Sequence, residues 1–160
     1  MTAVAELARI RGQFERIRAL TGDARLFTIN EKISGWSSAE HLDHLLKVAK
    51  SVFDRLPSDE VLPRGISFTG RCVLACRWIP RGVGKTPERL AGKQCTLEEL
   101  EARFGRVSTA LEALDTAAVD AARNPNVPHP RFGGLTPSQA LRFVTIHNAH
   151  HLKIVGDILR

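Results

Sequence analysis

Two histidines four positions apart stand in the last part of the chain, in the segment HNAHHLKI at 147–154. On a helix, the side chains of His147 and His151 would lie on one face, one turn apart. Both positions continue an apolar stripe that includes Val144 and Ile154, so both imidazoles would face inward. Buried polar rings need partners, and one shared metal ion would satisfy both. The alternative is a pair of core histidines, each hydrogen-bonded to a neighbouring group.

A third imidazole could come from the segment WSSAEHLDHLL at 36–46, which contains two histidines. His41 lies closer to the apolar stripe of its expected helix, and His44 lies at the edge of that stripe. Periodicity alone therefore does not choose between them.

Three imidazoles would leave a bound dication with at least one open coordination position. Structural zinc sites are usually closed by four protein ligands, so an open position is typical of a catalytic site. Nitrogen ligands suit several transition metals. We expect one divalent ion, zinc or nickel first, with iron, cobalt or manganese as alternatives. The open position would hold water or a substrate thiol, and the metal would lower the pKa of either one.

Other polar residues near these motifs have weaker claims on the chemistry, and none is assigned a catalytic role. Asn148 stands where a zinc peptidase would have its general-base glutamate, so we do not expect a peptidase. Glu40 is the best candidate for a general base, with helix capping as its alternative role. His150 is expected at the surface beside the site. His129 precedes a proline in a loop, and its role is left open.

These motifs, taken in order, resemble the DinB/YfiT-like superfamily of small metal-binding four-helix bundles, and in particular an uncharacterised branch of it. In that family a Trp is followed eight positions later by a metal-binding His, as Trp36 is followed by His44. The segment HPRFGGLTP at 129–137 is similar to the stretch before the family's last helix.

The family's closing signature matches His147 and His151. The resemblance therefore implies that His44, His147 and His151 bind the metal and that His41 does not. Relatives in this superfamily include transferases that add low-molecular-weight thiols to electrophiles, isomerases, and proteins with no known reaction. The resemblance thus implies a class of chemistry and leaves the substrate open.

The elements that would position these residues are helices, and three helix starts are marked by capping boxes. These boxes are Ser37 with Glu40, Thr96 with Glu99, and Thr136 with Gln139. The predicted long helices cover 3–20, 38–56, 97–122 and 137–159, and Pro57 would close the second. A long crossover separates the second from the third, and its piece at 68–79 is expected to form a shorter helix. The predicted fold is all-α, an up-down four-helix bundle with a long crossover between helices 2 and 3.

Composition places the chain among globular proteins. Its 160 residues fit one domain over 1–160, with 43% hydrophobic and 25% charged residues. No apolar run is long enough for a membrane span, and the N-terminus has no signal-peptide pattern, so we expect a cytoplasmic protein. Cys72, Cys76 and Cys95 are an odd number without a disulfide pattern, and we expect buried, reduced thiols.

Charge and motifs together lead to one functional hypothesis and its rivals. The net charge is +6, but the basic residues are spread along the chain, so nucleic acid is not the expected partner. We expect a metal-dependent enzyme of thiol S-transferase or hydrolase type. Its partner would be a small molecule, with a low-molecular-weight thiol as the leading candidate, and a homodimer is one open assembly. The alternatives are a non-enzymatic metal-binding or stress-response protein and a basic DNA-associated module.

Overall fold

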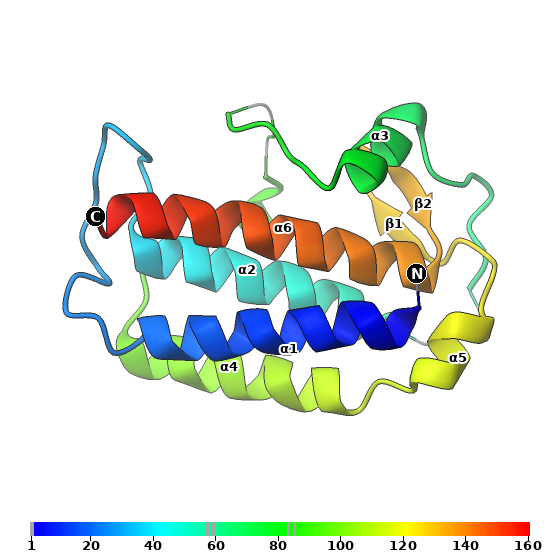
Figure 1. Cartoon of the computed structure of the whole chain (residues 1–160), viewed down its shortest axis with the longest axis horizontal. Coiled ribbons are helices and arrows are strands. Elements are labelled where there is room, and N and C mark those ends of the chain that lie inside the picture. Colours follow the sequence, from blue (N-terminus) through cyan, green and yellow to red (C-terminus); the bar gives the residue numbers. More distant parts are fainter. Residues whose placement is uncertain (1, 57, 59, 83, 85) are drawn as a thin grey trace.

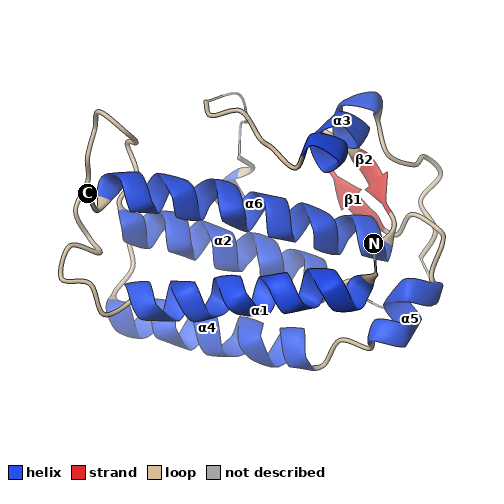
Figure 2. Cartoon of the chain, in the orientation of Figure 1, coloured by secondary structure: helices blue, strands red, loops and turns tan. Residues whose placement is uncertain are grey.

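Four long helices form a bundle in the computed structural model of the chain, which describes residues 2–56, 58, 60–82, 84 and 86–160. They are α1 (Ala3–Leu20), α2 (Ser38–Phe53), α4 (Leu97–Glu112) and α6 (Pro137–Ile158) (Figure 1). The predicted all-α fold class is confirmed. The shorter elements stand between these helices or at their ends (Figure 2).

The long helices begin where the capping boxes predict. The hydroxyl of Ser37 accepts from the Glu40 amide, and the Glu40 carboxylate accepts in return from the Ser37 amide. Equivalent boxes start α4 and α6, and α6 also has Pro137 in its first turn. Each box satisfies amide groups that a helix start leaves without partners.

Two of the predicted long helices end three or more residues earlier than expected. The second ends at Phe53 rather than at residue 56, and Pro57, which was expected to close it, lies outside the described residues. The predicted helix over 97–122 is broken. It stops at Glu112, and α5 (Thr116–Ala121) then begins at Asp115, whose carboxylate accepts from two amides of the new helix. This local side-chain cap competes with helix continuation.

The directions of the four long helices follow from the crossover. In Figure 1, α1 and α6 run from right to left, and α2 and α4 run from left to right. The second and third long helices share a direction because the crossover returns the chain to the end of the bundle where α2 begins. Helices α2 and α4 are therefore parallel, α1 and α6 are also parallel, and α2 runs antiparallel to α6. Helix α6 packs against both α1 and α2, so it borders two helix–helix seams.

The crossover carries the predicted shorter helix as α3 (Phe68–Cys76), followed by the one-turn 3₁₀ helix η1 (Glu88–Leu90). The residue that caps the C-terminal end of α3 is Arg77, whose φ of 53° lies in the left-handed region. All three cysteines are free, as expected. Cys72 and Cys76 are exposed, however, so the expectation of buried thiols was wrong for these two. Both lie on the outward face of α3, because this short helix buries only Gly70 and Leu74.

The sequence pattern did not indicate the small hairpin that precedes α6. Strand β1 (Val127–His129) pairs antiparallel with β2 (Gly133–Leu135). Gly133 has a φ of +79°, and a Cβ on Gly134 would lie 2.3 Å from the Arg64 carbonyl oxygen. Only glycine fits this close approach between the hairpin and the crossover.

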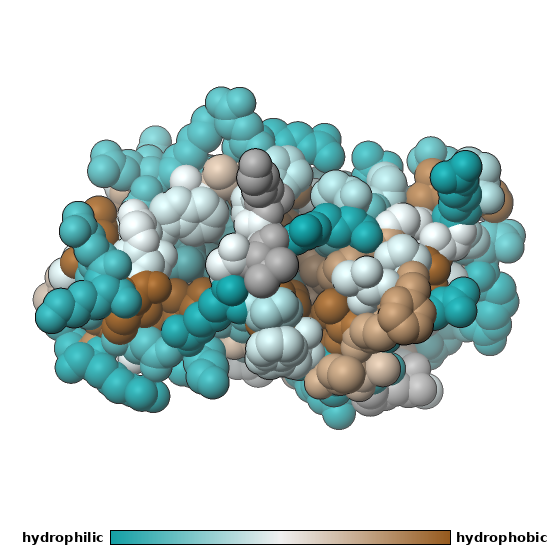
Figure 3. All heavy atoms as spheres, turned by 90° about the horizontal axis from the view of Figure 1, so that it is seen from above, coloured by the Kyte–Doolittle hydropathy of each residue, from teal (hydrophilic) through white to brown (hydrophobic). Residues whose placement is uncertain are grey.

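The core lies between the long helices, where the apolar stripes meet. The Phe14 ring of α1 contacts the rings of Phe53 and Phe104 from α2 and α4. Seen from above, over the crossover, hydrophobic residues appear in separate places between hydrophilic ones rather than as one continuous face (Figure 3). Within the described parts of the chain, no helix combines the length and apolar character that a membrane crossing requires.

Candidate metal centre

Three imidazoles meet in the seam between α2 and α6. Because the two helices are antiparallel, His44 on α2 lies opposite His147 and His151 on α6. One ring nitrogen from each residue belongs to a group whose members all lie within 4.8 Å of one another. The ring centroids are 4.8, 4.7 and 4.6 Å apart, close to an equilateral triangle. The predicted residues are thus brought together at one point.

The protonation of His44 is fixed by a backbone carbonyl. Its Nδ1 lies 2.6 Å from the oxygen of Leu90, which can only accept a hydrogen bond, so Nδ1 carries the proton. In the neutral ring the Nε2 atom then keeps its lone pair, and it lies 3.0 Å from the Nε2 of His147. A backbone carbonyl behind the ring is the usual way in which proteins orient a metal-ligating histidine.

Leu90 is held in place because Asp43 fastens the crossover to α2. The Asp43 side chain is fully buried and accepts a hydrogen bond from the amide of Lys93. It also forms ion pairs with Lys47 and Arg103, with Nε of Arg103 2.7 Å from Oδ1. Two cations and one amide thus compensate a carboxylate that could not be buried alone.

The same segment approaches α2 closely at Gly92. A Cβ at this position would lie 2.2 Å from the carbonyl oxygen of Glu40, so a side chain would push the crossover outward. Next to it, Lys47 donates through Nζ to the carbonyl of Ala91 at 2.8 Å. The backbone of residues 90–93 therefore lies directly on α2.

His151 is supported from its other side by His41. The two Nδ1 atoms are 3.0 Å apart, and His41 Nε2 lies 2.9 Å from the hydroxyl of Ser34. Ser34 in turn accepts from the amide of Trp36 at 3.0 Å. When Ser34 accepts from His41, the Nδ1–H of His151 donates to His41, and the Nε2 of His151 keeps its lone pair. His41 thus lies behind a candidate ligand rather than in the group of three.

His147 lacks such support. Its Nδ1 is buried and has no hydrogen-bond partner among the described residues. The Phe143 ring lies against it, with centroids 5.4 Å apart. Most buried polar atoms are hydrogen-bonded, and here the polar atom nearest to the His147 Nε2 is another imidazole nitrogen. Two lone pairs facing each other at 3.0 Å repel unless a proton or a cation lies between them. The donor set therefore fits a shared transition-metal ion.

Burial keeps these imidazoles neutral. Desolvation is the main cause that lowers the pKa of His44 and His151, and it lowers the pKa of His147 well below its ordinary value. It also lowers the pKa of His41 to about 4, with His44 as a second cause. Neutral imidazoles are the form that binds metals, because the ligating nitrogen must be unprotonated.

The other candidate residues lie outside the group. The Glu40 carboxylate accepts hydrogen bonds from the amide and the hydroxyl of Ser37, which confirms its alternative role in helix capping, and its role as a general base stays a prediction. The half-buried His150 ring contacts His151, with centroids 5.0 Å apart. Asn148 is fully buried, and its side-chain oxygen and nitrogen have no partners among the described residues.

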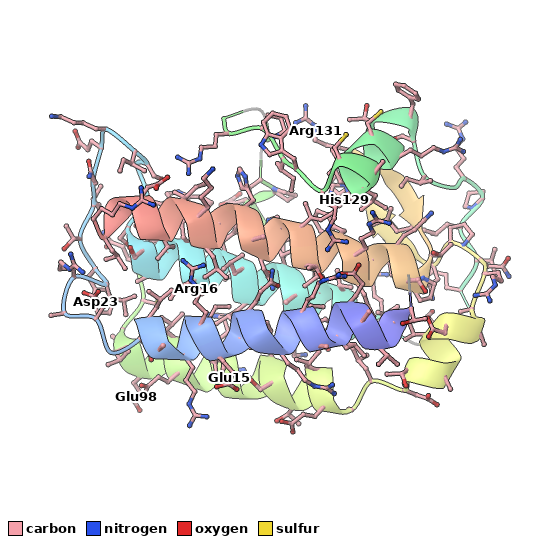
Figure 4. All side chains as sticks on the ribbon, in the orientation of Figure 1. Glu15, Arg16, Asp23, Glu98, His129 and Arg131 are labelled. Carbon is pink, nitrogen blue, oxygen red and sulfur yellow. The ribbon has the colours of Figure 1, made fainter. Side chains whose placement is uncertain are left out.

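His129 serves the hairpin rather than the candidate centre. Its Nδ1 accepts from the amides of Arg131 and Phe132, and its ring stacks on Phe132 with centroids 4.1 Å apart. Figure 4 labels His129 and Arg131. Burial is the main cause that lowers the pKa of His129 to about 4.

The residues that support the ligands could not be identified from their spacing. The Leu90 carbonyl belongs to the one-turn helix η1 and the Ser34 hydroxyl to a loop, and neither segment has a periodic pattern. Asp43 had one usable signal, the i,i+4 pair with Lys47, although such a pair is more often solvent-exposed.

The fold and the site define a class of protein: a helical bundle with a three-histidine candidate metal centre between two antiparallel helices. The family model of the DinB superfamily matches residues 5–155, and the chain belongs to this superfamily. The predicted resemblance is therefore confirmed. Comparison with curated proteins gave no match, and comparison with solved structures gave none.

Proposed function

We propose that this protein is a metal-dependent enzyme in which His44, His147 and His151 bind one divalent transition metal. The observation that supports it is the triangle of neutral imidazoles, of which His44 and His147 are buried and His151 is partly buried, and in which the Leu90 carbonyl fixes the Nε2 lone pair of His44. When bound, such an ion lowers the pKa of a water or thiol in its open coordination position. Zinc or nickel fits the nitrogen donors best, with iron, cobalt or manganese as alternatives.

The protein's own residues would orient the ligands and keep bulk water away. His41 and Ser34 hold the ring of His151, and Leu90 holds the ring of His44. His44 and His147 are each less than a tenth exposed. A low dielectric around the site strengthens every electrostatic interaction with a bound anion such as a thiolate.

We further propose a small-molecule substrate, with a low-molecular-weight thiol as the nucleophile, and a transferase reaction, with hydrolysis as the alternative. The crossover contributes one cationic side chain, Arg81, whose charge acts on histidines beside the site. It contributes to the lowered pKa of both His41 and His150, and it pairs with Asp157. Its positive charge would favour an anionic thiol. Three free cysteines support a cytoplasmic location.

A cobalt-substituted protein tests the proposal directly. A thiol that reaches the metal should change the visible spectrum of bound Co²⁺, and the double variant His44→Ala/His147→Ala should show neither the spectrum nor the change. Thiols that alter the spectrum would then be screened against model electrophiles. A bound-cobalt spectrum indifferent to every thiol, and no thiol transfer or hydrolysis in the screen, would favour the non-enzymatic metal-binding alternative.

A further inference from the structure

A second polar site lies on the opposite side of α6, in the seam with α1. The two parallel helices border a groove of about 540 Å³. This volume is within the range of about 300–1,000 Å³ that small-molecule sites occupy. Figure 4 labels Arg16 between the two helices. The histidines of the metal centre face α2, so this groove is separate from them.

Five basic side chains line the groove, and none of the described lining residues has a carboxylate side chain. They are Arg9 and Arg16 from α1, Arg77 from the end of α3, Lys153 from α6, and Arg160 at the C-terminus. Bringing like charges together around one space is unfavourable unless something compensates them.

Compensation by the protein is partial. Glu6 forms ion pairs with Arg9 and Arg77, at 3.3 and 3.1 Å. Asp157 pairs with Arg160 at 3.3 Å, and it is shared with Arg81 outside the groove.

Arg16 and Lys153, in contrast, form no ion pair within the described chain, and Arg16 is exposed. These two side chains therefore add positive charge to the groove that no ion pair within the described chain compensates. The surplus of positive charge remains available to an anion.

Small residues leave the space between the helices open. Gly12 on α1 and Ala149 and Gly156 on α6 all border the groove. A Cβ on Gly12 would meet nothing within 4 Å, and one on Gly156 would lie 3.5 Å from the Arg16 guanidinium. The guanidinium of Arg16 therefore lies close over the backbone of α6, where a ligand in the groove could meet it.

One uncharged group in the groove also lacks a partner. Gln13 donates through its amide nitrogen to the Thr145 carbonyl, at 2.8 Å, while its buried Oε1 has no hydrogen-bond donor among the residues that the structure describes. A buried acceptor left without a donor costs free energy. A hydroxyl group on a bound molecule would supply the missing hydrogen bond.

We infer that this groove binds a small molecule with at least two negatively charged groups, best matched by phosphates, and with a hydroxyl group. Arg9 and Arg16 stand two helical turns apart, roughly 10 Å along α1, so the positive charge is spread along the groove and suits a molecule with more than one negatively charged group. Guanidinium groups bind phosphate oxygens in pairs, which suits the arginines in the lining. The groove has no aromatic side chain on which the bases of a single strand would stack. The inference is independent of the proposed metal chemistry.

Inorganic pyrophosphate is the probe for a first test. Calorimetric titration of the full chain at about 0.15 M ionic strength should show one saturable site per chain. The variant Arg16→Gln/Lys153→Gln should weaken this binding at least tenfold. The control Arg11→Gln/Lys32→Gln removes the same charge from exposed positions outside the groove and should leave the affinity within about twofold.

Three results would overturn the inference. The first is no saturable binding of pyrophosphate by the wild type. The second is an equal loss of affinity in both double variants, which would mean attraction by net charge alone. The third is a short single-stranded oligonucleotide that binds more tightly and displaces pyrophosphate, which would point to nucleic acid. Metal content should be unchanged in Arg16→Gln/Lys153→Gln, and this separates the groove from the metal centre.

Discussion

Helix α6 offers two polar faces of opposite chemistry. Towards α2 it presents His147 and His151, whose pKa values burial lowers, so both rings are neutral and have lone pairs for a cation. Towards α1 it presents Lys153 among arginines at the surface, where charge is retained and anions are attracted. Burial, rather than residue choice alone, decides whether a nitrogen-bearing side chain receives a cation or an anion.

The largest effect should come from removing one ligand. We predict that His44→Ala loses its metal during purification, whereas the wild type keeps about one ion per chain. His150→Ala is the matched control, because its ring also contacts His151 but lies outside the group of three. Elemental analysis of all three proteins is the measurement. Full metal content in His44→Ala would contradict the assignment.

A smaller effect should follow from removing the support of a ligand. We predict that His41→Ala binds the metal 10- to 100-fold more weakly while still binding one ion, because His151 loses the partner of its Nδ1. Competition with a coloured chelator measures the affinity. Ser34→Ala should shift it in the same direction and by less. If His41→Ala lost the metal as completely as His44→Ala, His41 would itself be a ligand.

Acid should destabilise the metal-free protein. The pKa of His129 is about 4 in the folded chain and near 6.5 when unfolded. As pH falls, the unfolded state therefore binds the proton before the folded state does. The contribution of the neutral His129 to the free energy of unfolding is fully present above about pH 6.5 and is lost as pH falls towards 4. Urea unfolding at several pH values should show a smaller decline for His129→Asn, which keeps an acceptor for the turn amides but does not titrate. An equal decline would contradict the role of burial.

The smallest effect concerns nucleic acid. The net charge of +6 should give only weak binding to duplex DNA, which vanishes as salt rises, because it would rest on phosphate contacts alone. Fluorescence anisotropy with two unrelated duplexes at low and physiological salt is the measurement. Tight binding that distinguishes the two sequences would favour a DNA-associated module over the enzyme.

Much of the fold could be predicted because its signals are local. Capping boxes placed the starts of α2, α4 and α6, and apolar stripes placed the faces that pack together. The break before α5 was missed, because Asp115 acts as a cap only once the chain turns there. The exposure of Cys72 and Cys76 was missed for a similar reason, since α3 packs on the bundle through only part of its surface.

The three candidate ligands could be predicted from the sequence, whereas the residues that hold their rings in place could not. The i,i+4 spacing placed His147 and His151 together, and the family resemblance selected His44. Periodicity could not separate His41 from His44, and the structure shows why, because both are buried at the same seam. One ring faces the group of three, and the other lies behind His151. That distinction depends on contacts across helices, which no single-helix pattern contains.

A single hydrogen bond between His44 and the carbonyl of Leu90 couples the crossover to the candidate metal centre. Coupling between two equilibria is reciprocal, so a metal that binds better when residues 90–93 lie on α2 must also hold them there. Metal loading should therefore slow deuterium exchange at the amide of Lys93, which donates to Asp43. In the same way, Gly92→Ala should release metal faster although it touches no histidine, because its Cβ would displace the backbone from Glu40. The rate at which residues 90–93 separate from α2 would then set how long the metal stays bound.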